Sequence, residues 1–358
     1  MKKILLGFSA FALILSSCSN EIETATENSE SARNEIKVST YVPGATRSLV
    51  TSIENMEGDI QMFAYSTTSA YNFIDNYTYD GEWLSQYTQQ TGKKNYWPSD
   101  PTEIVNFLAI ATKEYVNIAS APTGGEYTLS GPGCYVFQST VQQSTLVDSI
   151  VFLQDTTSVG SNTIDHMIAS INTSLEETGN GCIDLNFNHI LAGVKVILKD
   201  TTDTEETPSE VSVVGVRIYA PTRISYVPSE GKAIVPANAI YKYYPIYAAQ
   251  ISEMGGPEYD VYMGSRGLNS EGVTFEDDED NDLADVLVPA TNKAILEISY
   301  FIGAPGVVKE AITKSAEISL TAGAITTITA IICEDPKISI SSVSVSDFES
   351  KDEDAGKL

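Results

Sequence analysis

The residues best suited to catalysis are few in this chain. It has two histidines, His166 and His189, and each lies among apolar residues. A histidine that acts as a general base needs a serine or cysteine nucleophile, but no Gly-x-Ser-x-Gly sequence accompanies either one. The 48 acidic residues form pairs by chance, so a carboxylate pair is no signal of hydrolysis. The pattern favours structural histidines, and we predict that the protein is not an enzyme.

One acidic run is the only candidate for an ion site. In Glu276–Asp282, the carboxylates of Asp278, Asp280 and Asp282 stand at alternate positions that could surround a calcium ion. The glycine turn and the final glutamate of an EF-hand loop are missing, so a solvated loop is favoured. A zinc site lacks ligands, because no cysteine pair has Cys-x-x-Cys spacing. We predict no metal and no cofactor.

Three cysteines follow the amino-terminal segment, and they are sparsely spaced: Cys134, Cys182 and Cys333. An odd number of distant cysteines is not a disulfide framework. Small buried hydrophobic residues are the favoured interpretation, and a single bridge is the alternative.

The first eighteen residues carry the clearest chemical signal, which is lipidation. Lys2 and Lys3 precede an apolar run, Ile4–Leu15, and the segment ends in Leu-Ser-Ser-Cys at Cys18. This order is typical of a secretory signal peptide with a lipoprotein cleavage sequence. The alternatives are an ordinary signal peptide or a short membrane anchor, but the run is short for about 30 Å of hydrocarbon. We predict cleavage before Cys18 and a diacylglycerol on its thiol, whose acyl chains tether the mature chain to a bacterial membrane.

The overall charge excludes one class of partner. The formal net charge is −27 at pH 7, which repels phosphate, so we expect no binding to nucleic acid. Hydrophobic residues make up 42% of the chain, which is enough to bury real cores.

The elements that must position these residues are strands. Ile36, Val38, Thr40 and Val42 alternate with polar residues before Pro43-Gly44, and many short apolar runs follow, separated by turn residues. Tyrosine, threonine and valine are abundant, as strands favour. The sequence therefore predicts an all-β fold built from β-sandwiches.

The length of the chain predicts two domains. The break is placed at the polar stretch before Ile183. The predicted parts are a signal peptide at 1–17, a lipidated flexible spacer at 18–34, an amino-terminal sandwich at 35–180, a carboxy-terminal sandwich at 181–348 and a polar tail at 349–358.

Both ends of the folded part carry alternating apolar strands. The first is Ile36–Val42, and the last has its apolar residues at Ile338, Ile340, Val343 and Val345. A missing edge strand leaves unpaired backbone groups and an apolar groove that another chain's strand can fill. Burying three or four aliphatic side chains would contribute at most about 5 to 12 kcal/mol to the free energy of binding, before the cost of ordering the strand is subtracted. The alternative is that each strand simply completes its own sandwich.

Five phrases, in this order along the chain, resemble the fimbrillin family of type V pilin-like surface lipoproteins. They are Asn95-Tyr96-Trp97-Pro98 with Val105-Asn106-Phe107-Leu108-Ala109, Asp165-His166-Met167-Ile168-Ala169, Leu185 to Val194, Leu320-Thr321-Ala322-Gly323, and Ile338 to Phe348. The resemblance covers nearly the whole chain. Phe348 stands where family members often have tryptophan, and Gly193 or Ala324 where they often have lysine.

The resemblance implies two tandem transthyretin-like β-sandwiches, export as an outer-membrane lipoprotein and display at the cell surface in a fimbria. It also implies assembly with other pilus subunits by strand exchange. An arginine-specific protease would cut after Arg47, the strand with Ile36, Val38, Thr40 and Val42 would leave, and the strand with Ile338, Ile340, Val343 and Val345 of another subunit would replace it. Arg33 precedes the first strand, so a cut there would open no groove.

The implied function is a structural or accessory pilus subunit that supports adhesion. The leading strand favours a shaft or anchor role over a tip role, and an anchor would remain uncut at Arg47. The alternative is a monomeric surface lipoprotein that binds a glycan or another host or microbial surface ligand without polymerising.

Overall fold

A computed structural model describes most of the chain after residue 34. The described residues are 35–41, 60–80, 82–112, 116–120, 133–141, 144–154, 156, 166–200, 203, 210–252, 261–263, 266–274, 286–302, 311–332 and 338–347. Several predicted features lie outside these ranges, namely Cys18, Val42, Arg47, the acidic run at 276–282 and Cys333.

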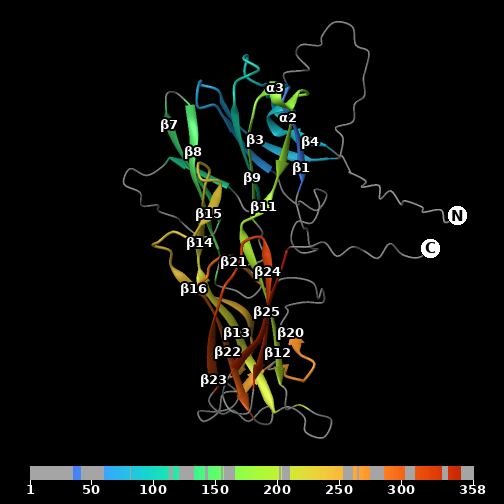
Figure 1. Ribbon diagram of the computed structural model, residues 1–358, viewed down its shortest axis with the longest axis vertical. Helices are drawn as coiled ribbons and strands as arrows, with labels where there is room; N and C mark the ends of the chain where they lie inside the picture. The colour runs from blue at the N-terminus through green and yellow to red at the C-terminus, as the bar shows by residue number, and fades with distance from the viewer. Residues whose placement is uncertain are drawn as a thin grey trace, which may run out of the picture.

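The upper half of the molecule in Figure 1 contains two sheets and one short strand pair. The six-stranded sheet has the order β11-β9-β5-β2-β3-β4, and the five-stranded sheet has the order β15-β14-β8-β7-β6. Their bounds are β2 Ile60–Tyr65, β3 Asn72–Tyr79, β4 Trp83–Ser85, β5 Val105–Thr112, β6 Val116–Ser120, β7 Gly133–Val141, β8 Ser144–Leu153, β9 His166–Thr173, β11 Asn188–His189, β14 Arg223–Val227 and β15 Lys232–Ile234. The strand pair joins β1 (Lys37–Tyr41) to β10 (Cys182–Asn186), and two short helices, α2 (Gln86–Thr91) and α3 (Leu175–Thr178), lie near it.

The lower half contains two further five-stranded sheets. One has the order β20-β12-β24-β25 with β21 also paired to β12, and the other has the order β16-β13-β22-β23 with β19 also paired to β13. Their bounds are β12 Leu191–Asp200, β13 Val211–Pro221, β16 Tyr241–Ala248, β19 Arg266–Gly267, β20 Val273–Thr274, β21 Val286–Pro289, β22 Ala294–Ile302, β23 Ile312–Ile318, β24 Ala324–Ile332 and β25 Ile338–Asp347; β17 (Gln250–Ser252) pairs with β18 (Val261–Met263). The predicted all-β fold is confirmed.

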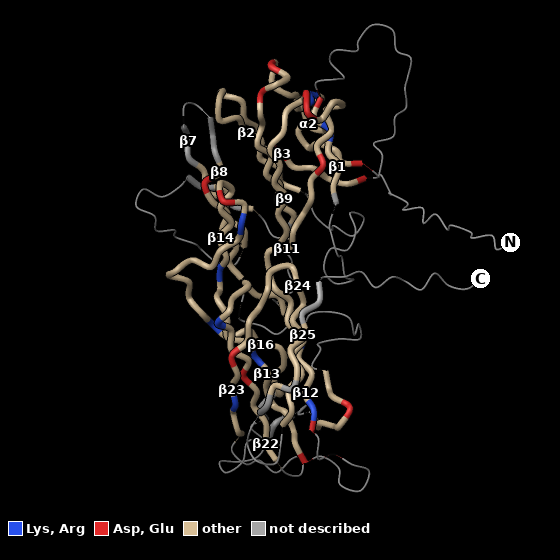
Figure 2. The backbone as a smooth tube through the Cα atoms, in the orientation of Figure 1, with Lys and Arg blue, Asp and Glu red and all other residues tan. Residues whose placement is uncertain are grey.

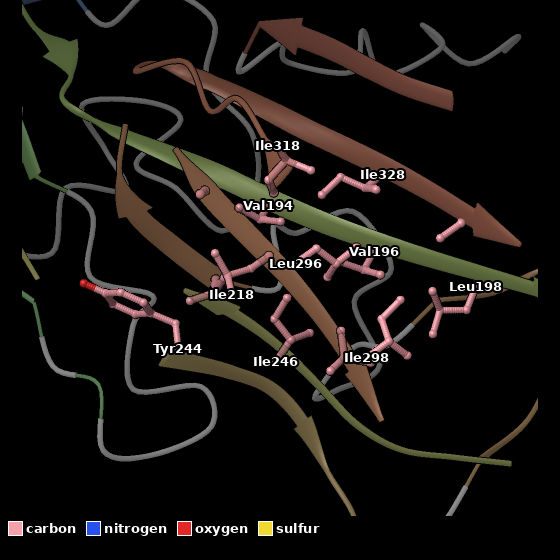
Figure 3. Packing of buried hydrophobic residues seen from close by; sticks show 14 of the residues in the cluster. Val194, Val196, Leu198, Ile218, Tyr244, Ile246, Leu296, Ile298, Ile318 and Ile328 are labelled. Carbon is pink, nitrogen blue, oxygen red and sulfur yellow. The ribbon is translucent and has the colours of Figure 1, made fainter. Parts of the chain in front are cut away.

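The lower core follows directly from period-2 patterning. Along β12, Val194, Val196 and Leu198 are fully buried, whereas the residues between them are partly exposed. Strand β22 repeats the pattern with Leu296 and Ile298. Because successive side chains of a strand point to opposite faces, these residues meet between the two sheets, as Figure 3 shows. Two facing sheets with such a core form a β-sandwich.

The upper core extends into the lower strands. One cluster combines Phe63 and Ile150 of the upper sheets with Leu191, Leu287 and Ile325, which begin or lie in β12, β21 and β24. A continuous apolar cluster across both halves resists their relative motion, because separating them would expose these side chains.

The topology bears on the predicted domain boundary at residue 180. Strands β10 and β11 follow that residue yet pair with β1 and β9, and β14 pairs with β8. Strand β12 is the first to enter a lower sheet. We propose that the chain changes sandwich at the start of β12, with β14 and β15 returning to complete the upper one.

Candidate functional site

Strand β1 lies at the margin of the upper sandwich. It pairs in parallel with β10 from Lys37↔Cys182 to Tyr41↔Asn186. On the other side of the strand, the contacts between described backbone groups occur only just before β1 begins. There Glu35 forms an isolated antiparallel bridge with Tyr96, and the Ile36 N–H donates to the Asn95 carbonyl at 3.0 Å. Figure 1 places β1 at the outer side of the upper half. Among the described strands, β1 is therefore not enclosed in the middle of a sheet.

The apolar face of β1 is nevertheless part of the core. Ile36 is 5% exposed, and Val38 is partly buried. Both belong to one hydrophobic cluster with Trp97, Ile183 and Leu185. Lys37, between them, is exposed. The alternation predicted for the first strand is confirmed over the described residues.

Two hydroxyl contacts hold the second half of β1. The Trp83 indole Nε1 donates to Thr40 Oγ1 at 3.0 Å, and Thr40 is only 7% exposed. Ser39 Oγ donates to the Asp184 carboxylate on β10. An indole N–H is a donor only, so the position of Thr40 requires an acceptor. We call the surroundings of β1, made by β10, Trp83 and the Asn95–Tyr96 segment, the β1 groove.

A buried carboxylate fixes one wall of the β1 groove. Asp75 on β3 is 6% exposed and accepts hydrogen bonds from Asn95 Nδ2 at 2.5 Å, from the Tyr87 N–H at 3.0 Å and from Ser85 Oγ. Asn95 is the residue whose carbonyl receives the Ile36 N–H. Because charged hydrogen bonds are stronger than neutral ones, Asp75 holds this acceptor in place.

Tyr77, which lies beside Asp75, is held in its neutral form. Burial raises the pKa of the neighbouring Tyr77 phenol, and the charges of Asp75 and Glu35 add to the increase, whereas the hydrogen bond with Asn95 opposes it.

At the surface, Lys94 pairs with Glu35 at 2.5 Å. Such an exposed pair contributes about 0 to 1 kcal/mol. Figure 2 shows charges of both signs close together beside α2 and β1.

Strand β25 is the second predicted element of strand exchange, and it forms the edge of its sheet. It pairs antiparallel with β24, with a register shift that leaves Ser341 between the paired residues Ile340 and Ser342. Ile340 is partly buried against the lower core, whereas Val343 is 47% exposed. An edge strand with an exposed valine is weakly held by the core.

The other predicted site residues lie in different places. His166 and His189 are buried on the neighbouring strands β9 and β11, and the ring centroid of His166 is 4.7 Å from that of Phe152. Cys134 and Cys182 are buried thiols, as predicted for small hydrophobic residues. Within the described ranges, no cluster of three metal-ligating side chains occurs, and no helix has the length and hydropathy of a membrane span.

The structure also brings together a surface cluster that sequence reasoning missed. Tyr219 on β13 lies 5.0 Å from Tyr243 and 5.6 Å from Tyr241, both on β16, between ring centroids. The Arg217 guanidinium lies 3.9 Å from the Tyr243 ring centre, and Arg217 Nε donates to Glu297 at 2.5 Å. The Tyr243 hydroxyl also donates to Glu297 at 2.9 Å, and this bond raises the pKa of Tyr243. The available signal was the alternation of Tyr241 and Tyr243 on either side of Lys242.

Comparison with known proteins finds solved structures with a similar fold. No protein-family model matches the chain, and no curated protein matches it significantly. A crystal structure of a fimbrial protein from Bacteroides vulgatus is similar with a TM-score of 0.55 at 16% sequence identity, over 88% of this chain and 99% of that one. A fimbrial assembly protein from Parabacteroides distasonis gives a TM-score of 0.36 at 9% identity, over 87% of this chain and 99% of that one. The chain therefore has the all-β fold seen in the Bacteroides vulgatus fimbrial protein.

Proposed function

We propose that the protein is a non-enzymatic structural or accessory subunit of a cell-surface fimbria. In this proposal β1 is removed by proteolysis and a strand of another subunit takes its place, and the resulting polymer supports adhesion. The observation that carries the proposal is the marginal position of β1, which pairs along its length with β10 alone among described strands. The fold shared with a fimbrial protein supports it.

The energetics of the β1 groove suit exchange. Full burial of an aliphatic side chain contributes about 1.5 to 3 kcal/mol; because Ile36 is buried and Val38 only partly, losing β1 removes at most about 3 to 6 kcal/mol before its backbone hydrogen bonds are counted. A domain of this kind is stable by only about 5 to 15 kcal/mol. Leaving the β1 groove empty therefore costs a large fraction of the free energy of unfolding of the upper sandwich. A replacement strand would recover this stability.

The donor in this proposal is β25. The two aliphatic residues of this strand whose side chains are described would lose little burial on leaving the lower sheet, because Val343 is already exposed and Ile340 is only partly buried. In the β1 groove, two of its aliphatic residues would be covered on the side where Ile36 and Val38 now pack. The difference in burial drives the transfer.

Cleavage after Arg47 is the step that would release β1. Arg47 follows the strand, whereas Arg33 precedes it. The test is to treat the purified protein with an arginine-specific protease and to follow it by mass spectrometry and SDS gels. We expect one cut after Arg47 and then SDS-resistant ladders. A cleaved chain that stays monomeric would contradict the proposal.

Membrane attachment in this proposal depends on Cys18. Two or three acyl chains would anchor the chain, because one chain binds only marginally. We expect labelled palmitate to enter the protein in cells and to be lost on Cys18→Ala. Cys134→Ala, which changes a buried thiol, is the matched control and should keep the label. Equal labelling after Cys18→Ala would remove the lipid anchor from the account.

The tyrosine cluster of Tyr219, Tyr241 and Tyr243 favours a second candidate function, glycan binding by a monomer. Aromatic faces stack on the apolar faces of sugar rings, and a fixed polar pair beside them can hydrogen-bond to hydroxyl groups. Arg217 and Glu297 neutralise one another. A neutral saccharide therefore fits this surface better than an acidic one.

Glycan binding predicts a specific effect of Tyr219→Ala. Losing the central ring should weaken binding of a neutral oligosaccharide about tenfold, the size of one stacking contact. Tyr87→Ala is the control, because Tyr87 is 40% exposed and stands on α2, away from the cluster. Binding would be measured by titration against an array of neutral and acidic glycans. Equal affinity for the two variants would exclude the cluster as the binding surface.

A further inference from the structure

We infer that the strand that fills the β1 groove is Ile338–Ser342 of a second copy of this chain, running parallel to β10 in the register of Ile36–Thr40. This inference rests on the proposed function and adds to it the half of β25 that enters, its direction and its register. It follows from matching the demands of the groove, position by position, with the sequence of β25.

The β1 groove makes a different demand at each position. It buries an aliphatic side chain at Ile36 and partly buries a second at Val38. It needs a buried hydrogen-bond acceptor at Thr40 for the Trp83 indole, and at Ser39 it favours a hydroxyl, which donates to Asp184 in an exposed contact. The position of Lys37 faces solvent and accepts any side chain. The required pattern is aliphatic, any residue, aliphatic, hydroxyl, hydroxyl.

The sequence of β25 changes phase in its middle. Ile338 and Ile340 alternate with serine up to Ser341-Ser342, after which Val343 and Val345 alternate in the opposite phase. In the lower sheet the register shift at Ser341 accommodates this change. The pairing of β1 with β10 runs through five residues with no shift. A strand that replaces β1 in the same ladder can therefore use only one half of β25.

The first half satisfies every demand of the β1 groove. Ile338 takes the place of Ile36, Ile340 that of Val38, and Ser342 that of Thr40. Ser341 then stands at the position of Ser39, opposite Asp184 on β10. Each hydroxyl of β1 is replaced by a hydroxyl, so Trp83 and Asp184 keep their hydrogen bonds.

Two other alignments that place valines on the apolar face each fail at one position. The second half, Val343–Asp347, places the Asp347 carboxylate at the position of Thr40, where only 7% of the side chain is exposed. A buried carboxylate with one neutral donor is strongly disfavoured. The reversed segment, from Val345 back to Ser341, places valine in the space of Ile36 and leaves a void.

A native cysteine reports the register directly. Cys182 on β10 pairs with Lys37, so the donor residue at that position lies beside its thiol. In the inferred register this residue is Ser339. In both alternative alignments it is Ser344. The two variants Ser339→Cys and Ser344→Cys form a matched pair, since both replace a serine of β25. Each would be cleaved with the arginine-specific protease, assembled and then oxidised.

We expect Ser339→Cys polymers to form a disulfide with Cys182 of the neighbouring copy, seen by mass spectrometry of the linked peptides. The link should be lost when Cys182→Ala is added, and Ser344→Cys polymers should not form it. A link through Ser344→Cys, or no link in either polymer, would overturn the register while the proposed function stands. Failure of the unchanged chain to polymerise would instead overturn the proposed function and this inference with it.

Assembly kinetics provide a second readout that does not depend on oxidation. Ser342 is exposed in the subunit, so Ser342→Asp should leave the monomer folded. In the inferred register this variant puts a carboxylate beside Trp83, and we expect assembly to slow at least about tenfold. Asp347→Ser is the control and should assemble at the original rate. Faster assembly of Asp347→Ser with no effect of Ser342→Asp would show that the second half enters.

Discussion

Arg47→Ala is expected to abolish polymer formation by the purified, protease-treated protein. The change removes the cut that would free β1, so Ile36 and Val38 stay in the β1 groove and Cys182–Asn186 keeps its partner. An occupied groove competes with the donor strand intramolecularly, and the tethered strand has a high effective concentration. The SDS-resistant ladder should therefore fall from its full intensity to background, while the far-ultraviolet circular dichroism stays unchanged.

Arg33→Ala is the matched control for this prediction. Arg33 lies on the other side of β1 in the sequence, so losing it should leave the ladder intact. If Arg47→Ala polymerises as well as the unchanged protein, either cleavage elsewhere releases β1 or polymers form without its removal. In either case the role assigned to Arg47 would be wrong.

Asp75→Ala is expected to lower the free energy of unfolding of the uncleaved protein by about 2 to 5 kcal/mol, because it leaves buried donors without their charged acceptor. Three groups lose this acceptor, namely the Asn95 amide, the Tyr87 N–H and the Ser85 hydroxyl. The loss should be measured from the midpoint and slope of urea unfolding. Glu82→Ala, which changes an exposed acid close by in the chain, is the control and should change stability by less than about 0.5 kcal/mol.

The effect of Asp75→Ala should also reach β1. Asn95 places the carbonyl that receives the Ile36 N–H, so releasing Asn95 should speed hydrogen exchange at Ile36 and leave exchange in the lower sandwich unchanged. Unchanged stability in Asp75→Ala would mean that this network does not hold the wall of the β1 groove.

The pattern of apolar and polar residues along the chain predicted the features that depend on residues close together in sequence, namely strands and their buried faces. Alternation identified the buried face of β1 at Ile36 and Val38 before any contact was known, and the many short apolar runs correctly indicated strands. These predictions succeed because side-chain direction in a strand is fixed by a period of two. The sparse cysteines also predicted the burial of Cys134 and Cys182 as thiols.

Long-range pairing could not be predicted in the same way. Strand β1 pairs in parallel with a strand far away in sequence, because Ser39 and its partner Asp184 are separated by 145 positions. Trp83 and Asp75 gave no local sign of their roles, because each acts on a segment distant in sequence. The tyrosine cluster joins β13 to β16 through a register that contains a bulge, so its ring contacts follow from strand pairing and not from spacing.

Strand exchange would be seen directly in a cryo-electron microscopy map of the polymer formed after arginine-specific cleavage. Its decisive feature is the strand beside Cys182–Asn186. We expect residues 37–41 to be gone and the density there to continue into β24 of a neighbouring subunit, with isoleucine side chains at the positions of Ile36 and Val38. Density that traces back to residues 37–41 of the same chain would show that the polymer forms without strand exchange.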